Sequence, residues 1–437
     1  MPKVAVIGAS GLIGEAVTRY LMSEGIEVVA IARRLSPAQK FALGPAAREC
    51  PIVDLAPDAL AELFDRECVD VVVNCVGVLR PADPGSDDVH EGFVGRLLEA
   101  LPRCEVESLL VHLSIPGQAG EDATPFSTTK RSAERSIASG GVPHVLLRPG
   151  FVIAPAPYGA SALMRSLAML PVCLPGKEAA APFMTTEVAD IGRTIAVAVR
   201  KWRNGERGWG ETWEVMSREP TSVGDVLTAF RDRYAGPRPV LRLPAVALNF
   251  GAVLGDFAAR LGWSPPIGRT ALQEARRGVR GDPEPWIAAT GIEPLSIQDA
   301  LARNPVTIQE KWFAHLYLIK AVAIFMLTVF WTVSGLIVLG VSFKPAAAIL
   351  TAHGFPAALA NAVTVVSSCA DIAVGAAIAF QRTCRAGLLF GIGLSLFYLV
   401  SAAVITPDMW VEPLGALVKT GPAIILMMAT LAMLEKR

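Results

Sequence analysis

Residues 4–17 read VAVIGASGLIGEAV, and this stretch decides the fold of the N-terminal part of the chain. A short apolar run ends at Ile7, and glycines follow at Gly8, Gly11 and Gly14, where a helical pattern takes over. Glycine lets the backbone turn tightly and come close to a pyrophosphate, which binds at the positive N-terminus of the next helix. On a strand, a turn and a helix in succession, this pattern predicts a dinucleotide-binding βαβ unit.

Short apolar runs alternate with helical patterns over residues 1–150. Continuous apolar runs are typical of strands that are buried on both faces of a parallel sheet. Strands that alternate with helices predict an α/β fold with a doubly wound parallel Rossmann sheet. The expected strands are Val4–Ile7, Val28–Ala32, Val69–Val73, Leu109–Leu113 and Val145–Leu147, and helices such as Leu12–Met22 and Ala59–Phe64 lie between them. We therefore assign residues 1–150 to a nucleotide-binding core.

Residues 151–310 have a mixed pattern, and we expect them to complete this domain with a small α+β cap. Val188–Val199 reads as a helix, Thr212–Met216 as a strand, and a capped helix is expected to begin near Ser222. The apolar run Ala245–Gly255 is short for a membrane span. It suits a buried or interfacial helix better.

Composition places part of the chain in lipid. The 437 residues are 52% hydrophobic and 18% charged, against averages of about 45–50% and about 25%, and the mean hydropathy is +0.44. A net charge of zero provides no basic face for nucleic acid. The seven cysteines are odd in number and irregularly spaced, without a CxxC pair, so neither a disulfide framework nor a metal site is expected.

From residue 311 onward the sequence predicts an all-α, four-helix transmembrane domain. The run Ala321–Phe343 carries no charged residue and exceeds the ~20 apolar residues that a span requires. These segments are apolar on all sides, whereas a soluble bundle would show polar stripes. The expected spans lie near residues 321–343, 357–380, 386–405 and 414–434, and Lys419 interrupts the last one.

Basic residues predict the orientation of these spans. The opening MPKVAVIG lacks the pattern of a signal peptide, so we expect the N-terminal domain in the cytosol. Four spans then place QRTCR at 381–385 and EKR at 435–437 on the cytosolic side, where Lys311 and Lys320 also flank the first span. This positive-inside bias predicts a multi-pass protein of the cytoplasmic (inner) membrane with its C-terminus in the cytosol.

The residues after the second expected strand bear on cofactor choice. Arg33 lies nineteen residues past Gly14, where an acidic residue often binds the ribose of NAD and where arginine suits a 2′-phosphate. Arg33 and Arg34 therefore favour NADP(H), with NAD as the alternative. For Arg34, a solvated surface charge is an equally good interpretation.

Six motifs follow one another as in an atypical short-chain dehydrogenase/reductase. They are GASGLIG at 8–14, VDL at 53–55, VNCVG at 73–77, VHLS at 111–114, FSTTK at 126–130 and LRPGFVI at 147–153. The resemblance spans roughly residues 1–300 and is greatest to the membrane-associated branch that includes the Rossmann-like accessory subunit of respiratory complex I. The C-terminal part, with MWVEPLGALVKTGP at 409–422, is similar to a DoxX-like membrane domain. The whole chain resembles bacterial fusions of the two.

This resemblance implies roles for individual residues. Asp54 would contact the adenine, Gly77 and its neighbours would line the cofactor, Ser114 would hold a substrate carbonyl, and Lys130 would bind the nicotinamide ribose. The expected cofactor-binding residues are Gly8, Ser10, Gly11, Leu12, Ile13, Gly14, Arg33, Arg34, Asp54, Leu55, Cys75, Val76, Gly77 and Lys130.

The family's proton-donating tyrosine is replaced by Phe126 in this sequence. A tyrosine has a pKa near ~10 that a neighbouring ammonium can lower, whereas phenylalanine has no transferable proton. General acid–base help of typically ~10²–10⁴-fold must then be lost or supplied by another group. Tyr158 is a candidate for that role, and we expect His112, on an apolar strand, to be a core residue.

Three kinds of function stay open. We expect an NAD(P)-dependent oxidoreductase with Ser114 and Lys130 as catalytic residues, acting at the membrane on a quinone, a lipid or another apolar acceptor. The alternative is a non-catalytic NADP(H)-binding scaffold or sensor of a membrane complex, with a membrane protein as partner. A transporter would rest on Asp371, an intramembrane carboxylate for which Lys320 and Tyr398 are possible partners.

Overall fold

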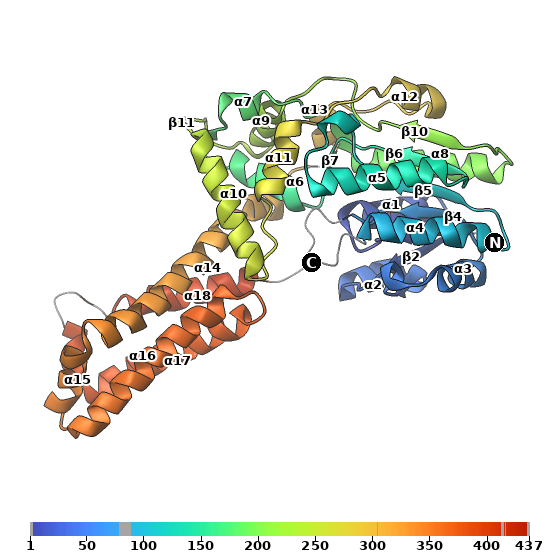
Figure 1. The fold of residues 1–437 in the computed structure, drawn as a ribbon. Helices are drawn as coiled ribbons and strands as arrows, with labels where there is room; N and C mark the ends of the chain where they lie inside the picture. Colours follow the sequence, from blue (N-terminus) through green and yellow to red (C-terminus); the bar gives the residue numbers. More distant parts are fainter. Residues whose placement is uncertain (1–2, 78–88, 304, 412–414, 416, 435–437) are drawn as a thin grey trace. The chain divides into compact units, whose positions relative to one another are not determined.

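The chain folds into two compact units, which Figure 1 shows in a computed structural model. One unit comprises Met1–Val253 and Pro266–Ile308, and the other comprises Leu254–Pro265 and Gln309–Arg437. The structure describes residues 3–77, 89–303, 305–411, 415 and 417–434.

A seven-stranded sheet, parallel throughout, forms the centre of the first unit, in the order β10-β6-β5-β4-β1-β2-β3 (Figure 1). The order runs outward from β1 in both directions, as in a doubly wound sheet. This confirms the predicted fold class. The strands are β1 (Lys3–Ile7), β2 (Val28–Ala32), β3 (Ala47–Glu49), β4 (Val69–Asn74), β5 (Leu109–Leu113), β6 (His144–Leu147) and β10 (Gly210–Trp213).

Helices cover both faces of this sheet and create two apolar cores. Neighbouring residues of a strand point to opposite faces, so Val4 and Val6 of β1 belong to one core and Ala5 and Ile7 to the other. Helices α1 (Leu12–Ser23) and α8 (Val188–Arg203) contribute to the first core, and α3 (Pro57–Arg66), α4 (Glu91–Ala100) and α5 (Pro125–Ser139) to the second.

The sheet also takes a strand from beyond residue 150. The strand expected at Thr212–Met216 is β10, at Gly210–Trp213, and it pairs with β6. Helix α9 (Val223–Tyr234) begins after Ser222, whose side chain accepts a hydrogen bond from Asp225 N, as the capping signal predicted.

Smaller elements complete the first unit and the connection to the second. Two short parallel pairs join β7 (Phe151–Ile153) to β9 (Thr185–Glu187) and β8 (Val172–Cys173) to β11 (Leu241–Arg242). The remaining helices are α2 (Pro37–Leu43), α6 (Gly159–Ala168), α7 (Gly176–Ala179), α10 (Ala245–Arg260), α11 (Arg269–Arg277), α12 (Glu284–Thr290) and α13 (Ile297–Ala302).

The second unit is helical and apolar. Within the described residues, three helices are long and apolar enough to cross a membrane, and two shorter apolar helices accompany them. The long helices are α14 (Ile308–Gly340), α16 (Ala357–Ala379) and α17 (Cys384–Ile405); the shorter ones are α15 (Phe343–Ala352) and α18 (Thr420–Met433).

The fourth predicted span, near residues 414–434, differs from its expected length. Helix α18 begins only after Lys419, which is its N-cap residue, and has 14 residues. At 1.5 Å per residue it measures roughly 21 Å, less than the ~30 Å hydrocarbon core. Within the described residues, the structure therefore supports three candidate spans, and α18 is a short apolar helix in place of the fourth.

Small residues allow these helices to pack closely. A Cβ atom on Gly335 of α14 would lie 2.5 Å from the Ser368 carbonyl oxygen of α16, and one on Gly375 would lie 2.2 Å from Thr332 Oγ1. Glycines at such contacts let helix backbones approach each other, which is typical of helix packing in lipid.

Candidate functional site

The glycine bend between β1 and α1 is a backbone cradle with no room for side chains. Gly8 has a φ of +84°, a conformation that favours glycine, and a Cβ atom there would lie 3.2 Å from the Cys75 carbonyl group. A Cβ atom on Gly14 would lie 2.2 Å from the Gly8 carbonyl oxygen. Gly11 N donates to that same oxygen at 2.9 Å. The bend thus fits the close approach of a pyrophosphate.

The start of α1 leaves its backbone donors without a side-chain cap. The N-cap residue is Gly11, and among the described residues no side chain caps the first turn. Ser10 and Gly11 are exposed at this turn, and Leu12 and Ile13 are half-buried. The free N–H groups and the helix dipole suit an anion at this end.

The loop after β2 is fastened to the glycine bend. Gln39 Nε2 donates to the Ser10 carbonyl oxygen at 3.2 Å and to Glu15 Oε2 at 2.7 Å. Arg33 and Arg34 are exposed directly after β2. Because β2 pairs with β1 in parallel register, these arginines and the bend lie at the same edge of the sheet.

The predicted adenine contacts follow the next strand. Asp54 ends a short 3₁₀ helix, Ile52–Asp54, and its side chain is exposed, while Leu55 is half-buried. This helix comes soon after β3, which pairs with β2. The structure thus brings Asp54 and Leu55 to the same sheet edge as Arg33.

Lys130 of α5 forms hydrogen bonds to the chain at the ends of both β4 and β5. Its Nζ donates to the Val76 carbonyl oxygen at 2.8 Å and to the Leu113 carbonyl oxygen at 3.0 Å. A Cβ atom on Gly77 would lie 3.5 Å from Lys130 Nζ. Burial lowers the pKa of Lys130 to about 8, although the neighbouring Cys75 and Glu134 oppose that shift.

Cys75 lies at the inner side of this group. Its backbone N donates to the Ile7 carbonyl oxygen at 2.9 Å, which holds the end of β4 beside the glycine bend. Burial raises the pKa of the Cys75 thiol to about 12, although the residue keeps some exposed surface. A neutral thiol is a poor nucleophile, so Cys75 serves as packing here.

Ser114 follows β5 and carries a buried hydroxyl. Its Oγ has no hydrogen bond of ordinary geometry to the described residues, although Glu134 lies close enough for the hydroxyl to help stabilise its carboxylate. A buried polar atom without a partner is rare in folded proteins. The hydroxyl therefore fits a ligand oxygen at this end of the sheet.

Glu134, on α5, was missed from the sequence. Arg148 Nε and Nη2 each donate to its carboxylate at 2.8 Å, and Arg131 Nη1 donates at 2.6 Å. Burial opposes its ionisation, but the hydrogen bonds and charges of Arg148 and Arg131 lower the pKa of the Glu134 carboxyl. The available signal was its position, one helical turn after Lys130 on the same helix.

Phe126 lies in the position expected for the tyrosine, next to a second residue that the sequence did not suggest. The His90 ring meets the Phe126 ring edge-on, with centroids 5.6 Å apart, and His90 Nδ1 lies 2.9 Å from Thr129 Oγ1. Burial, followed by the charge of Lys130, lowers the pKa of His90 to about 4. The imidazole is therefore neutral near pH 7.

The other candidate residues lie apart from this group or in the core. Tyr158 is 61% exposed and precedes α6, where it caps the helix. His112 is buried in β5 and lies 3.2 Å from the Asn74 side chain, which confirms the predicted core histidine. In α16, Asp371 accepts a hydrogen bond from Tyr398 Oη at 2.8 Å, so Tyr398 rather than Lys320 is its partner.

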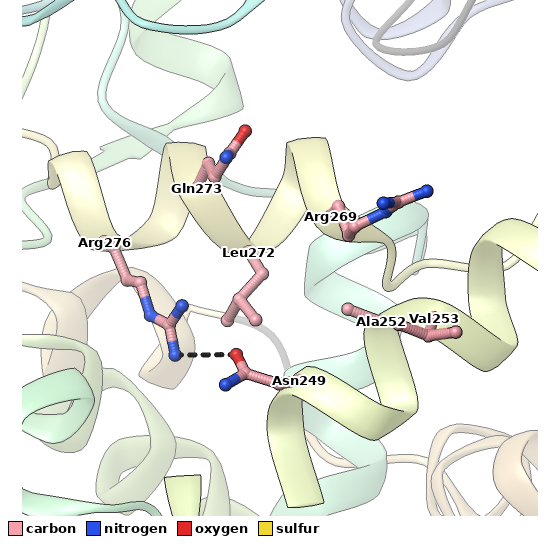
Figure 2. A pocket seen from close by; sticks show the side chains of 7 residues that line it. All are labelled: Asn249, Ala252, Val253, Arg269, Leu272, Gln273 and Arg276. Carbon is pink, nitrogen blue, oxygen red and sulfur yellow. Dashed lines mark hydrogen bonds between the residues drawn. The ribbon is translucent and has the colours of Figure 1, made fainter. Parts of the chain in front are cut away.

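A pocket of about 220 Å³ lies elsewhere, between α10 and α11 (Figure 2). None of its lining residues is among those predicted to bind the cofactor or substrate. They are Asn249, Ala252, Val253, Arg269, Leu272, Gln273 and Arg276. This pocket and the glycine bend are therefore separate features of the first unit.

Two known protein families match separate parts of the chain. Residues 4–165 match the NAD dependent epimerase/dehydratase family, and residues 328–428 match the DoxX-like family. The chain thus joins a Rossmann domain of the epimerase/dehydratase type to a DoxX-like membrane domain, as the sequence predicted. The likeness to the complex I accessory subunit stays an expectation.

One curated relative has a described activity. It is a dTDP-6-deoxy-L-talose 4-dehydrogenase (NAD(P)(+)) from Kitasatospora kifunensis, 29% identical over 185 residues, which are 37% of this chain. The match spans 56% of the relative's own length, so it covers little more than half of that enzyme.

Solved structures show the same fold. A UDP-glucose 4-epimerase from Thermotoga maritima, with UDP-glucose, gives a TM-score of 0.52 at 16% identity and covers 72% of this chain and 98% of its own. A UDP-glucuronic acid 4-epimerase from Bacillus cereus, in complex with UDP-glucuronic acid and NAD, gives 0.50 at 16% identity over 72% and 99%. At such identities the likeness concerns the fold alone.

Proposed function

We propose that this chain is a membrane-tethered oxidoreductase whose N-terminal domain binds NADP(H) and which acts on an apolar acceptor, such as a quinone or a lipid, at the inner membrane. One observation carries the proposal: the glycine bend, Lys130 and the buried Ser114 hydroxyl meet at the carboxyl edge of one parallel sheet. Ligands of open α/β sheets bind at this edge.

The residues at this edge would divide the binding of the dinucleotide among them. The bend at Gly8 and Gly14 would take the pyrophosphate against the uncapped start of α1. Arg33 would take the 2′-phosphate, with a charge-assisted contact. Asp54 would contact the adenine. Lys130 would hold the nicotinamide ribose through the ammonium that now meets two backbone carbonyls.

When bound, the nicotinamide supplies or accepts a hydride. Ser114 would orient an acceptor oxygen with its buried hydroxyl. Phe126 provides no proton, and the neutral His90 beside it is a weak acid and a weak base. An acceptor such as a quinone can take its proton from water. The residues present therefore suit such an acceptor better than the alcohol chemistry of an epimerase.

A membrane tether makes sense for an acceptor that is itself in the membrane, because confinement raises its local concentration. Arg382 lies in the loop after α16 and Arg385 in the first turn of α17, and the positive-inside rule favours the cytosol for this connection. We propose the cytosol for the N-terminal domain as well. If α18 completes a fourth crossing, the C-terminus is cytosolic, and if it does not, the C-terminus lies outside, which a C-terminal reporter fusion distinguishes.

A second function has an observation in its favour. Phe126 removes the usual proton donor, and Lys130 already uses two of its three N–H donors on the Val76 and Leu113 carbonyl oxygens. Both facts suit a domain in which NADP(H) is a structural or sensing ligand and the protein is a scaffold of a membrane complex. In that case the nucleotide binds but no acceptor oxidises it.

Turnover separates these two functions. The full-length protein in nanodiscs is mixed with NADPH and a panel of soluble quinones. Nucleotide sugars are also tested, because the similar proteins include a dTDP-6-deoxy-L-talose 4-dehydrogenase and a UDP-glucose 4-epimerase. The enzyme is supported if NADPH absorbance falls with the wild-type protein, if Lys130→Ala abolishes this fall, and if the exposed control Lys177→Ala keeps it. Tight NADPH binding without oxidation by any acceptor, together with a stoichiometric protein partner, supports the scaffold.

A further inference from the structure

Helix α10 exposes a continuous apolar stripe. The large apolar side chains recur every three or four residues, which places them along one face of a helix. Each is about half exposed or more: Val246 74%, Phe250 63%, Val253 51%, Leu254 49% and Phe257 58%. Single exposed apolar residues are common on protein surfaces. An aligned row of five on one helix marks an interaction surface.

The chain just before α10 extends this surface. Val240 is 81% exposed and Leu241 is 58% exposed. Both precede the helix in the short strand region of β11. The apolar surface thus covers residues 240–257, and we call it the α10 stripe.

The neighbouring face of α10 is already occupied within the first unit. Ala252 is fully buried, and Asn249 Oδ1 accepts a hydrogen bond from Arg276 of α11 at 3.1 Å (Figure 2). Arg276 also donates to Glu178 Oε1 at 2.7 Å. Helix α10 is therefore amphipathic, with a polar contact to α11 beside an uncovered apolar side.

Exposed arginines lie beside the stripe in the sequence. Residues 238–260 contain Arg238, Arg242 and Arg260 but only one acidic residue, Asp256, which gives a net charge of +2 in a chain whose total is zero. Basic and apolar side chains together are typical of helices that lie in the interface of an anionic bilayer. A second copy of this surface would repel the first by the same charge, so charge favours lipid over self-association.

The end of α10 continues into residues that are fixed to a candidate span. Trp263 Nε1 donates to the Ala379 carbonyl oxygen at 2.8 Å, and Gln381 N donates to the Leu261 carbonyl oxygen at 3.0 Å. Ala379 is the last residue of α16. The segment after α10 therefore contacts the end of the candidate span α16.

We infer that the α10 stripe inserts into the interfacial region of an anionic lipid bilayer, with α10 lying along the membrane surface. Leu254 and Phe257, nearest the contact with α16, would reach the acyl chains, and the exposed Arg238, Arg242 and Arg260 would meet lipid phosphates. The inference needs the membrane domain but not nucleotide binding. Residues 245–260 would then help to hold the N-terminal nucleotide-binding domain at the bilayer.

Photocrosslinking in the full-length chain tests this contact. Phe250, Phe257 and, as a matched control, Phe41 are replaced one at a time by the photoreactive analogue benzoylphenylalanine. Phe41 is 92% exposed on α2 and is also a phenylalanine, so the chemistry of the probe is the same. Each protein is irradiated in nanodiscs of phosphatidylcholine alone or with phosphatidylglycerol, and adducts are identified by mass spectrometry.

We expect lipid adducts at positions 250 and 257, none above background at position 41, and a higher yield with phosphatidylglycerol. Equal lipid labelling at all three positions, or none at 250 and 257, would overturn the insertion. Crosslinks from 250 or 257 to a second copy of the chain would show a protein interface instead. Equal yields in the two lipid mixtures would remove the role of anionic lipid.

Discussion

Replacing Gly14 with alanine tests the glycine bend at a position where the structure leaves no space for a side chain. The new Cβ atom would lie 2.2 Å from the Gly8 carbonyl oxygen, 2.8 Å from the Gly8 carbonyl carbon and 3.1 Å from Ala9 Cα. Ordinary carbon contacts lie near 3.5–4.0 Å, so the bend must open by roughly 1 Å. These neighbours are backbone atoms and cannot rotate away, and overpacking of this kind costs about 1–3 kcal/mol.

The same movement displaces the donors that would meet the pyrophosphate. N–H···O hydrogen bonds have N···O distances of about 2.7–3.2 Å, and a charge-assisted one contributes about 1.5–3 kcal/mol. Losing one such bond lowers affinity roughly ten- to a hundredfold. We therefore expect Gly14→Ala to lose at least this much affinity in a titration of NADPH fluorescence, and to melt at a lower temperature.

Gly95→Ala is the matched control for this substitution. Gly95 is inside α4, and a Cβ atom there would meet nothing within 4 Å. Alanine stabilises a helix interior by roughly 0.5–1 kcal/mol relative to glycine, so this variant should melt slightly higher and bind NADPH unchanged. A folded Gly14→Ala protein with the same NADPH affinity as the Gly95→Ala control would refute the reasoning about the bend.

Arg33→Ala should weaken NADPH binding roughly ten- to a hundredfold, since a charge-assisted contact contributes about 1.5–3 kcal/mol, and should leave NADH binding unchanged; equal losses in parallel titrations would count against the 2′-phosphate contact. Because the folded-state pKa of Lys130 is about 8, its ammonium is present below this pH, and NADPH affinity should fall as the pH rises through 8. Lys130→Arg keeps the charge and should flatten that pH profile, and an unchanged slope would exclude Lys130 as its source. Phe126→Tyr places a phenol near Lys130 and His90 and should raise the rate of any alcohol or carbonyl turnover by up to ~10²–10⁴-fold; no gain in stopped-flow rates would show that the missing proton donor does not limit the reaction.

The Rossmann core could be predicted because its signals are local. Each central strand is a short run of apolar residues, and the bend at Gly8 allows only one kind of connection between β1 and α1. The motif order singled out Ser114 and Lys130, which follow β5 and lie on α5 in the structure. The Val76 and Leu113 carbonyls that Lys130 contacts come from residues 54 and 17 positions away, and no local pattern encodes such a meeting.

The remainder depended on tertiary structure. His90 gave no signal, because a single histidine before a helix looks like any surface residue, and only packing sets it against Phe126. Glu134 likewise became recognisable only through its contact with Arg148. The length of α18 was overestimated because apolar residues also precede Lys419, whereas the helix begins only after Lys419.

The central claim is that the bend after β1 holds a pyridine nucleotide. Isothermal titration calorimetry of the full-length wild-type protein in nanodiscs, with NADPH and NADH injected in turn, tests it most directly. We predict saturable binding of one nucleotide per chain, tighter for NADPH than for NADH. Protein that circular dichroism shows to be folded, yet that gives no heat of binding with either nucleotide, would contradict the account.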